Sequence, residues 1–293
     1  MKRKDFLKNT LLGSSILAVS KTFGNQIHHQ NDEIFEPNPK QIQGFNHIQN
    51  TNSKIMDNMI IHRADSRGSA NHGWLNAKHS FSFANYYNPE RMNFGALRVL
   101  NDDQIAEGMG FGTHPHDNME IITIPLHGAI EHKDSMGNSS VIRAGEIQVM
   151  SAGTGIQHSE FNHHKDQSLQ LLQIWIFPNK QNVTPRYDQL ALDSASKQNQ
   201  FSQILSPDPK DDGVWIHQNA WFHIGQFDKD KTTNYQLKDK SNGIYAFVIN
   251  GKFLIENQDL STRDAIGLWN QDQILVESAS DNAEILIIEV PMT

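Results

Sequence analysis

Short apolar runs separated by turn residues constrain the fold of this chain more than any other feature. They begin at Met59 and recur to the end of the sequence, with almost no stretch of helical periodicity between them. Turn-like residues 101–103 close one run, and the polar stretch 134–138 connects two others as a hairpin. The strands predicted in the first half are 60–61, 81–83, 96–100, 119–126, 129–132, 140–143, 147–151 and 169–177. Strands this short at such spacing indicate an all-β sandwich or barrel.

The second half repeats the pattern after a polar stretch at residues 188–212, which has the composition of a linker. The strands predicted here are 213–217, 221–227, 243–250, 253–256, 265–269 and 284–290. Two short segments echo the first half, because residues 249–253 resemble 126–130 and residues 263–265 resemble 143–145. An internal repeat of this kind predicts a second barrel built like the first.

The N-terminus has the three-part layout of an export signal. Residues 2–4 are basic, residues 11–19 are apolar but too few to span a membrane, and small residues follow. Residues 3–8 resemble a twin-arginine signal in which lysine replaces the second arginine. We therefore predict that residues 1–24 direct the protein to the periplasm without a stable membrane anchor. The alternatives are an amphipathic N-terminal helix and, if the signal is not functional, a cytoplasmic protein.

Residues 25–57 are rich in Asn, Gln, His and Pro and show little periodicity, which is typical of a flexible linker. The predicted organisation is thus a signal, this linker, and two β-barrel or jelly-roll domains in tandem at residues 58–188 and 189–293. The oligomeric state has no signature in the sequence.

Charge and cysteine content exclude several classes of function. The net charge is −8 and no basic stripe is present, so a nucleic-acid partner is not expected. The chain contains no cysteine, which excludes disulfides, thiolate metal sites and cysteine nucleophiles.

Histidines with strand spacing provide the strongest functional signal. His114 and His116 lie two residues apart, and so do His158 and Glu160 after an intervening hairpin. Residues two apart on a strand point to the same face, so both pairs can project into one space. Three imidazoles and one carboxylate suit iron, copper, nickel, manganese or zinc.

These residues also fit known family signatures. The spacing of Gly108, His114, His116 and Glu120 resembles the first signature of the cupin superfamily. A distorted second signature comprises Gly145, Gly153, Gly155, His158 and Asn162. Further segments resemble the pirin family of cupins in the same order along the chain, namely 71–75, 79–83, 96–99, 112–116, 151–156, 158–160 and 173–176. The resemblance runs from about residue 59 to residue 291, and the bacterial pirin-like quercetin 2,3-dioxygenases are the most similar members.

The resemblance implies a bicupin fold and a specific set of ligands. Positions matching the pirin metal ligands are His114, His116, His158 and Glu160. Glu120, which would be the acidic ligand of a general cupin, becomes a residue that supports the ligands or packs the strand. Because it lies four residues after His116, strand alternation could turn it inward. The implied cofactor is one divalent metal ion, expected to be iron(II), with copper, nickel, manganese, cobalt or zinc as alternatives.

The reaction implied by the resemblance is the opening of the central ring of a flavonol by O2, with release of carbon monoxide. Glu160 would then serve as a general base for the substrate 3-hydroxyl. Phe81, Phe83 and Phe111 are candidates to flank the flat substrate, although core packing is expected for at least two of them. The partners are therefore a small aromatic, flavonol-like substrate and O2.

Two other classes of function fit the same ligands. The pirin family includes non-enzymatic proteins that act through binding partners with the metal as a redox-sensitive switch, and cupins host metalloenzymes of other chemistry. The second barrel is expected to lack a metal site. Positions equivalent to the ligands of the first barrel hold Leu237, Asp239, Ser278 and Ser280.

Overall fold

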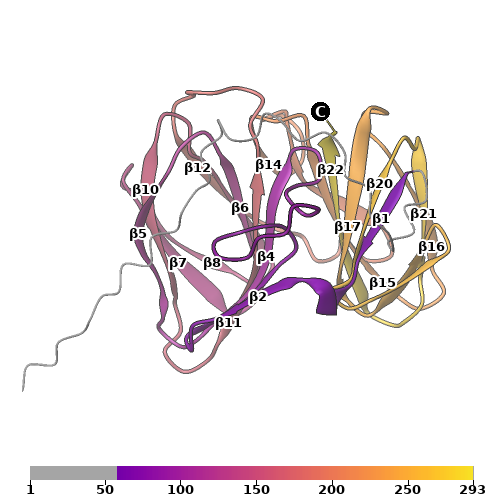
Figure 1. Cartoon of the computed structure of the whole chain (residues 1–293), viewed down its shortest axis with the longest axis horizontal. Helices are drawn as coiled ribbons and strands as arrows, with labels where there is room; N and C mark the ends of the chain where they lie inside the picture. The colour runs from indigo at the N-terminus through magenta and orange to yellow at the C-terminus, as the bar shows by residue number, and fades with distance from the viewer. Residues whose placement is uncertain (1–57, 293) are drawn as a thin grey trace, which may run out of the picture. The chain divides into compact units, whose positions relative to one another are not determined.

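The computed structural model describes residues 58–292, most of which form β-strands (Figure 1). The helical part of this region is a single 3-10 turn, η2 (Ala64–Ser66). None of the described residues belongs to a helix long and apolar enough to cross a bilayer. The predicted signal at 1–24 and the predicted linker at 25–57 lie outside the described residues.

The first barrel consists of a seven-stranded and a four-stranded sheet. The large sheet has the order β12-β9-β6-β11-β4-β3-β2, and the small sheet has the order β5-β10-β7-β8. The strands of the large sheet are β2 (Gly68–Asn71), β3 (Leu75–His79), β4 (Leu97–Ile105), β6 (Glu120–His127), β9 (Glu146–Ser151), β11 (Leu169–Ile176) and β12 (Arg186–Ala191). Those of the small sheet are β5 (Gly110–His116), β7 (Ala129–Asp134), β8 (Ser139–Arg143) and β10 (Ile156–Asn162).

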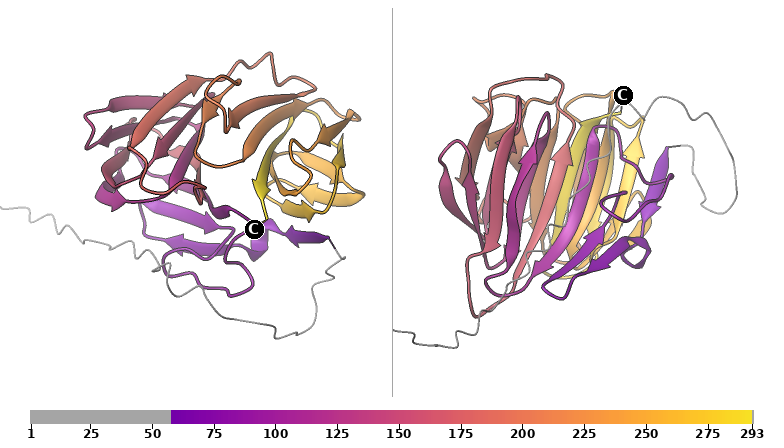
Figure 2. Two further views of the ribbon diagram at one scale, coloured as in Figure 1. Left: turned by 90° about the horizontal axis from the view of Figure 1, so that it is seen from above. Right: turned by 60° about the vertical axis from the view of Figure 1, so that its left-hand side comes forward.

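The second barrel repeats this arrangement of one large and one small sheet. The large sheet has the order β1-β20-β17-β22-β15-β13-β14, and the small sheet has the order β16-β21-β18-β19. The strands of the large sheet are β1 (Met59–His62), β13 (Phe201–Ser206), β14 (Val214–Trp215), β15 (Trp221–Phe227), β17 (Asn242–Asn250), β20 (Ala265–Trp269) and β22 (Ala283–Pro291). Those of the small sheet are β16 (Thr232–Gln236), β18 (Lys252–Ile255), β19 (Gln258–Ser261) and β21 (Gln273–Ser278). Seen from above, the strands of each barrel surround their own interior (Figure 2).

One apolar core is shared by the two large sheets. Its buried members come from both barrels and include Leu97, Leu172, Ile174, Phe222, Phe247 and Leu286. Alternate residues of the same strands fill the separate barrel interiors, as Ile287 does beside Leu286 on β22. Strands buried on both faces carry continuous apolar runs, which explains why the run at 285–288 shows no polar alternation.

Strand β1 connects the two halves in an unexpected way. It belongs to the N-terminal part of the chain, yet it pairs antiparallel with β20, beside which it lies in Figure 1. The Arg63 guanidinium, just after β1, bonds the Asp264 carboxylate at 2.8 Å. At the other end of the first barrel, β12 crosses the predicted domain boundary at 188 and 189. The two barrels therefore do not correspond to two consecutive segments of the chain.

Most strands lie where the apolar runs predict them, but three predictions were wrong. Residues 101–103 continue β4 instead of forming a turn. Asn101 and Asp103 are buried in the first barrel, and the carboxylate of Asp102 forms ion pairs with Arg67 and Arg263. Residues 81–83 contain one bend and one isolated bridge rather than a strand. The predicted linker at 188–212 contains β13, whose residues Ile204 and Leu205 are buried in the shared core.

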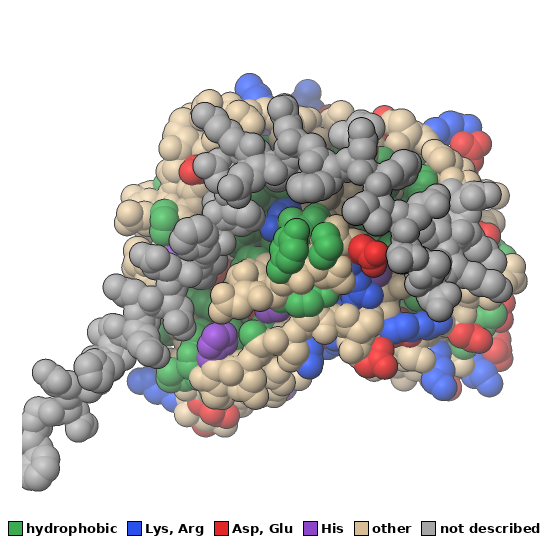
Figure 3. Space-filling view, viewed as in Figure 1, with side chains coloured by type: hydrophobic (Ala, Val, Ile, Leu, Met, Phe, Trp, Pro, Cys, Tyr) green, Lys and Arg blue, Asp and Glu red, His purple; other side chains and the backbone are tan. Residues whose placement is uncertain are grey.

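Charged side chains of both signs lie on the described surface. In the space-filling view, acidic and basic side chains are intermixed along the right-hand side of this face (Figure 3). A histidine side chain reaches the surface on the opposite side, next to hydrophobic side chains (Figure 3). That side carries the strands of the first barrel in Figure 1.

Candidate metal centre

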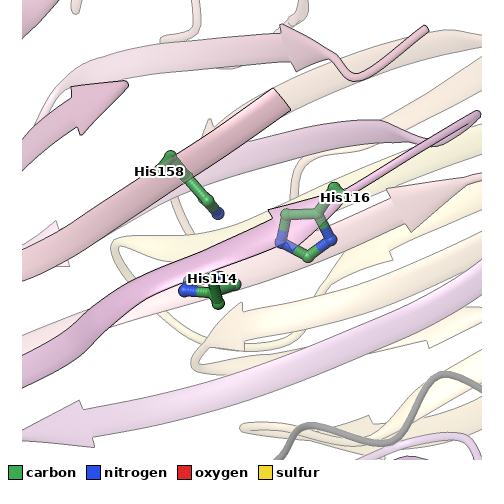
Figure 4. A group of neighbouring side chains, drawn as sticks. All are labelled: His114, His116 and His158. Carbon is green, nitrogen blue, oxygen red and sulfur yellow. The ribbon is translucent and has the colours of Figure 1, made fainter. Parts of the chain in front are cut away.

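Two neighbouring strands of the small sheet bring the predicted histidines together. β5 pairs antiparallel with β10, and His114 lies directly opposite His158. His116, two residues further on β5, points to the same face as His114 because strand side chains alternate. Figure 4 shows the side chain of His158 extending toward His114 and His116.

The three imidazoles are close enough to share one ion. Their ring centroids lie 4.9 Å apart for His114 and His116, 4.4 Å for His114 and His158, and 4.9 Å for His116 and His158. One nitrogen from each ring lies within 4.8 Å of the other two. His116 and His158 are buried and His114 is half-buried, so one side of the cluster can be reached from solvent.

The contacts of two rings indicate which nitrogen carries the proton. The Nδ1 of His114 lies 2.8 Å from the carbonyl oxygen of Gly112, which can only accept a hydrogen bond, so this Nδ1 carries the proton. The Nε2 of His158 is buried and has no hydrogen-bond partner among the described residues. Burial, followed by the neighbouring histidines, lowers the pKa of His158, which keeps this ring neutral. A neutral imidazole with a free lone pair is the form that binds a metal.

Glu160 lies in the same barrel and forms a second group of possible metal ligands with His132 and His158. One of its carboxylate oxygens lies within 4.8 Å of ligand atoms of His158 and His132, so His158 is common to both groups. The amide of Gln173 donates to Glu160 Oε2 at 3.0 Å, and the hydroxyl of Thr123 lies 3.4 Å from Oε1. Burial raises the pKa of Glu160 to about 7, although these two hydrogen bonds oppose the shift.

A bulge in β10 explains how Glu160 reaches its position. The register between β5 and β10 shifts between His158 and Glu160, so that Glu160 pairs with Phe111. At this bulge the backbones approach closely, because a Cβ on Gly110 would lie 2.2 Å from the carbonyl oxygen of Glu160. Glycine is therefore required at position 110 for the two strands to pair here.

Glu120 does not face the histidines, contrary to the expectation that its spacing from His116 could turn it inward. Its neighbour Ile122 on the same face belongs to the shared core, whereas Thr123 on the opposite face reaches Glu160. Between β5 and β6 the strand is interrupted, and Asn118 has a φ of 44°. Side-chain alternation does not carry across such a break, so Glu120 packs the strand and accepts a hydrogen bond from Ser151 at 2.6 Å.

Aromatic side chains flank the histidine cluster on two sides. Phe81 is 1% exposed and belongs to the shared core, as core packing predicts. Phe111 is half-buried, with its ring 6.4 Å from that of His114, and Phe83 packs edge-on against Trp175 at 5.3 Å. The ring of Trp175 lies 5.0 Å from that of His116. Sequence reasoning missed Trp175, although its alternation with buried residues of β11 places it inside the barrel.

His132 is a second residue whose position the sequence did not reveal. It is fully buried on β7, directly opposite Glu160 on β10. Its place two residues before Asp134, on the face that also carries buried Ile130, was the available signal. His163 lies outside the cluster near Glu131, while His79 bonds Asn101 at 2.8 Å inside the barrel.

Comparisons with known proteins agree with this arrangement. Residues 61–176 match the Pirin family model, and residues 203–290 match the model of the quercetinase C-terminal cupin domain. A quercetin 2,3-dioxygenase of Escherichia coli K12 is 43% identical over 233 residues, which cover 80% of this chain and 99% of that protein. A pirin-like protein of Caulobacter vibrioides is 39% identical over 227 residues, covering 77% of this chain and 96% of that protein.

Solved structures show the same relationship. The bacterial pirin YhhW from Escherichia coli in complex with nickel(II) has a TM-score of 0.75 and 41% identity, covering 80% of this chain and all of that one. Both barrels are therefore cupin-type domains, as the sequence predicted. With this identity over most of both chains, the protein belongs to the pirin family.

Proposed function

We propose that this protein is a metal-dependent dioxygenase that opens the central ring of a flavonol such as quercetin with O2. The observation that carries the proposal is the convergence of three imidazoles within 4.8 Å, with Glu160 beside His158, inside the first barrel. Relatives that carry the name quercetin 2,3-dioxygenase align with 80% of the chain at 43% identity, which supports this chemistry.

The residues present fit a divalent metal ion. His114, His116 and His158 would hold it through one ring nitrogen each, with the carboxylate of Glu160 as the fourth ligand. We propose iron(II) as the metal, because imidazole and carboxylate suit it and the reaction consumes O2. Nickel is the first alternative, since a solved relative binds nickel(II).

A bound divalent ion supplies Lewis acidity that favours the ionised 3-hydroxyl of the substrate. Glu160 takes up the proton of that hydroxyl. Its pKa of about 7 in this buried site allows it to accept and release a proton near neutral pH. Gln173 and Thr123 hold the carboxylate while it changes protonation state. The ring opening breaks two carbon–carbon bonds, incorporates both atoms of O2 and releases the carbon between them as carbon monoxide.

The aromatic side chains beside the histidines favour a flat substrate. Phe111 lies next to His114 at the open side of the cluster, and Trp175 closes the side of His116. Aromatic rings of a bound flavonol can pack edge-on or offset against such side chains. The buried indole N–H of Trp175 has no hydrogen-bond partner in residues 58–292, so it is available to a polar group of the substrate.

Oxygen uptake with quercetin tests the proposal. Protein stripped of metal is reloaded separately with iron, nickel, copper, manganese or cobalt, and uptake is recorded with an oxygen electrode. We expect uptake that depends on the metal and disappears in His158→Ala, while His163→Ala, which alters a histidine outside the cluster, keeps it. Stoichiometric metal binding with no quercetin-dependent uptake for any metal would contradict the proposed reaction and favour a metal-dependent binding role.

We also propose that the protein is exported to the periplasm. The basic residues 2–4, followed by the apolar residues 11–19, support this location. A fusion of residues 1–24 to a reporter that works only after export would give signal in wild type and lose it when residues 2–4 become acidic. Signal that survives this change would contradict export through this segment.

A further inference from the structure

A buried chain of polar side chains leads away from the candidate metal centre. It begins at His158, passes through His132 and ends at Asp134 on the hairpin between β7 and β8. The Nδ1 of His158 lies 3.5 Å from the Nδ1 of His132. The Nε2 of His132 lies 3.2 Å from Oδ2 of Asp134. The side chains of His132 and Asp134 are 1% and 0% exposed, so solvent does not compete with these contacts.

Asp134 is fixed by the hairpin that it begins. Its Oδ1 accepts hydrogen bonds from the backbone N–H groups of Met136 and Asn138 at 2.9 and 3.0 Å. Its Oδ2 accepts from the side-chain amide of Asn138 at 2.8 Å. These bonds stabilise the ionised form and lower the pKa of Asp134, although burial opposes the shift. The carboxylate therefore presents an acceptor to His132.

The acceptor at Asp134 determines which nitrogen of His132 carries the proton. A neutral imidazole has one N–H donor and one acceptor nitrogen. The proton of His132 lies on Nε2, where it is donated to Asp134, and its Nδ1 is left as an acceptor facing His158. The ring of Tyr187 packs on His132 with centroids 4.9 Å apart, which restricts rotation of the imidazole.

We infer that His132, held by Asp134, is a positioning residue that keeps the proton of His158 on Nδ1 and leaves its Nε2 free to bind the metal. The carbonyl of Gly112 holds the proton of His114 on Nδ1 in a comparable way. Hydrogen bonding of the second ring nitrogen is a general way to orient a metal-binding histidine and to make it more basic. This inference rests on the proposed metal site, but it does not depend on the reaction that the site performs.

Two substitutions at one position test the inference. His132→Asn keeps an acceptor atom near the position of Nδ1, whereas His132→Leu removes it at similar size. The matched control is His79→Leu, which removes another buried, hydrogen-bonded histidine of the first barrel that does not contact His158.

The first readout is the tautomer of His158 in metal-free protein, measured by ¹⁵N NMR of the imidazole nitrogens. We expect the proton of His158 on Nδ1 in wild type, in His132→Asn and in His79→Leu, and a shift toward the Nε2–H form in His132→Leu. A proton on Nε2 in wild type, or no change in His132→Leu, would overturn the inference.

The second readout is the affinity for nickel(II), measured by calorimetry. We expect His132→Leu to weaken binding about 10–100-fold, with His132→Asn and His79→Leu remaining within a few-fold of wild type. Two bound nickel ions in wild type, one of which is lost in His132→Leu, would overturn the inference by making His132 a ligand itself. Absence of nickel binding in wild type would overturn the metal site together with it. If the tautomer and the nickel affinity behave as expected but wild-type protein does not turn over quercetin, only the proposed reaction is contradicted.

Discussion

Single residues of the first barrel divide into those that face the metal centre and those that support it. Three histidines present nitrogen atoms to one point, and Glu160 lies beside one of them. Glu160 and Glu120 are both buried acids with a pKa raised to about 7. Glu160 lies inside the first barrel near Thr123, whereas Glu120 lies on the face of β6 that carries Ile122 of the shared core. The two carboxyl groups have similar pKa values, so their different roles follow from their positions.

The histidine pair on β5 is expected to be essential for metal binding and dispensable for folding. His114→Ala combined with His116→Ala removes two of the three imidazoles, while the apolar cores are untouched. We expect metal content after reloading to fall to background by mass spectrometry, with the far-UV circular dichroism spectrum unchanged. Full metal occupancy in the double variant would refute the site.

Glu120 is expected to make metal-free protein less stable as pH rises. Burial raises its pKa from an ordinary 4.5 to about 7, so between these values the folded state binds one proton that the unfolded state has released. Stability then falls with rising pH across this window, by at most ~1.4 kcal/mol per pH unit, and is flat above about pH 7.

Urea unfolding of wild type and Glu120→Gln between pH 4.5 and 8 measures this contribution. Glutamine has no proton to release but can still accept from Ser151. The difference in unfolding free energy between the two proteins should change with pH below about 7 and stay constant above it. A difference independent of pH over the whole range would contradict the account.

For single residues, the sequence indicated which histidines lie together better than it indicated what surrounds them. Alternation along a strand predicted that His114 and His116 point to one face. Pairing of β5 with β10 brings His158 to them. The inward expectation for Glu120 was wrong, because an irregular segment separates it from β5. His132 was not identified, because its partners His158 and Asp134 become neighbours only through strand pairing.

The strand pair β5 and β10 is the element on which the centre depends. Close approach of the two backbones at the bulge leaves no room for a side chain at Gly110, whereas a Cβ on Gly112 would have no heavy atom within 4 Å. These two glycines on the same strand form a matched pair for substitution.

Gly110→Ala is expected to displace β5 from β10 beside Glu160 and to reduce nickel affinity at least 10-fold, in the range seen when groups supporting a metal site are disturbed. Gly112→Ala should bind nickel as wild type does, since its added methyl group points into open space. Calorimetric titration of both variants compares them directly. Equal affinities would show that the bulge does not position Glu160.

The strands were predicted well where burial of apolar side chains sets the sequence pattern. The prediction failed where hydrogen bonds, ion pairs or strand pairing hold polar residues in a strand. The apolar runs that became β11, β15 and β20 were predicted almost to their ends. Residues 101–103 look like a turn, yet buried hydrogen bonds and ion pairs hold them in β4. The polar strands β16 and β19 carry too little apolar pattern to be recognised without their pairing partners. Strand β21 was missed although it contains the apolar run 274–276.

Across the whole described molecule, the shared core couples the two barrels. Residues of both large sheets contribute to it, and β1 pairs with the second barrel before the chain enters the first. The sequence repeat predicted two barrels but gave no indication of this common core. We therefore expect the two barrels to unfold together.

Leu286→Ala tests this coupling against Ile287→Ala, its neighbour on β22. Both side chains are fully buried, but Leu286 lies in the shared core and Ile287 lies in the interior of the second barrel. Each substitution should lower the free energy of unfolding by about 2–5 kcal/mol. If the barrels are coupled, circular dichroism and release of bound metal will report one midpoint in both variants. Metal retained in the first barrel after most of the β-structure has been lost would contradict coupling.

The fate of labelled oxygen during turnover of quercetin by the metal-loaded protein shows directly whether the site opens the flavonol ring. If the site opens the flavonol ring, both atoms of ¹⁸O₂ will appear in the ring-opened product and one carbon monoxide will be released for each O2 consumed. Glu160→Gln should slow this turnover strongly. Oxygen consumption that yields hydrogen peroxide without carbon monoxide would contradict ring opening in this site, because it would show that the metal only oxidises the flavonol.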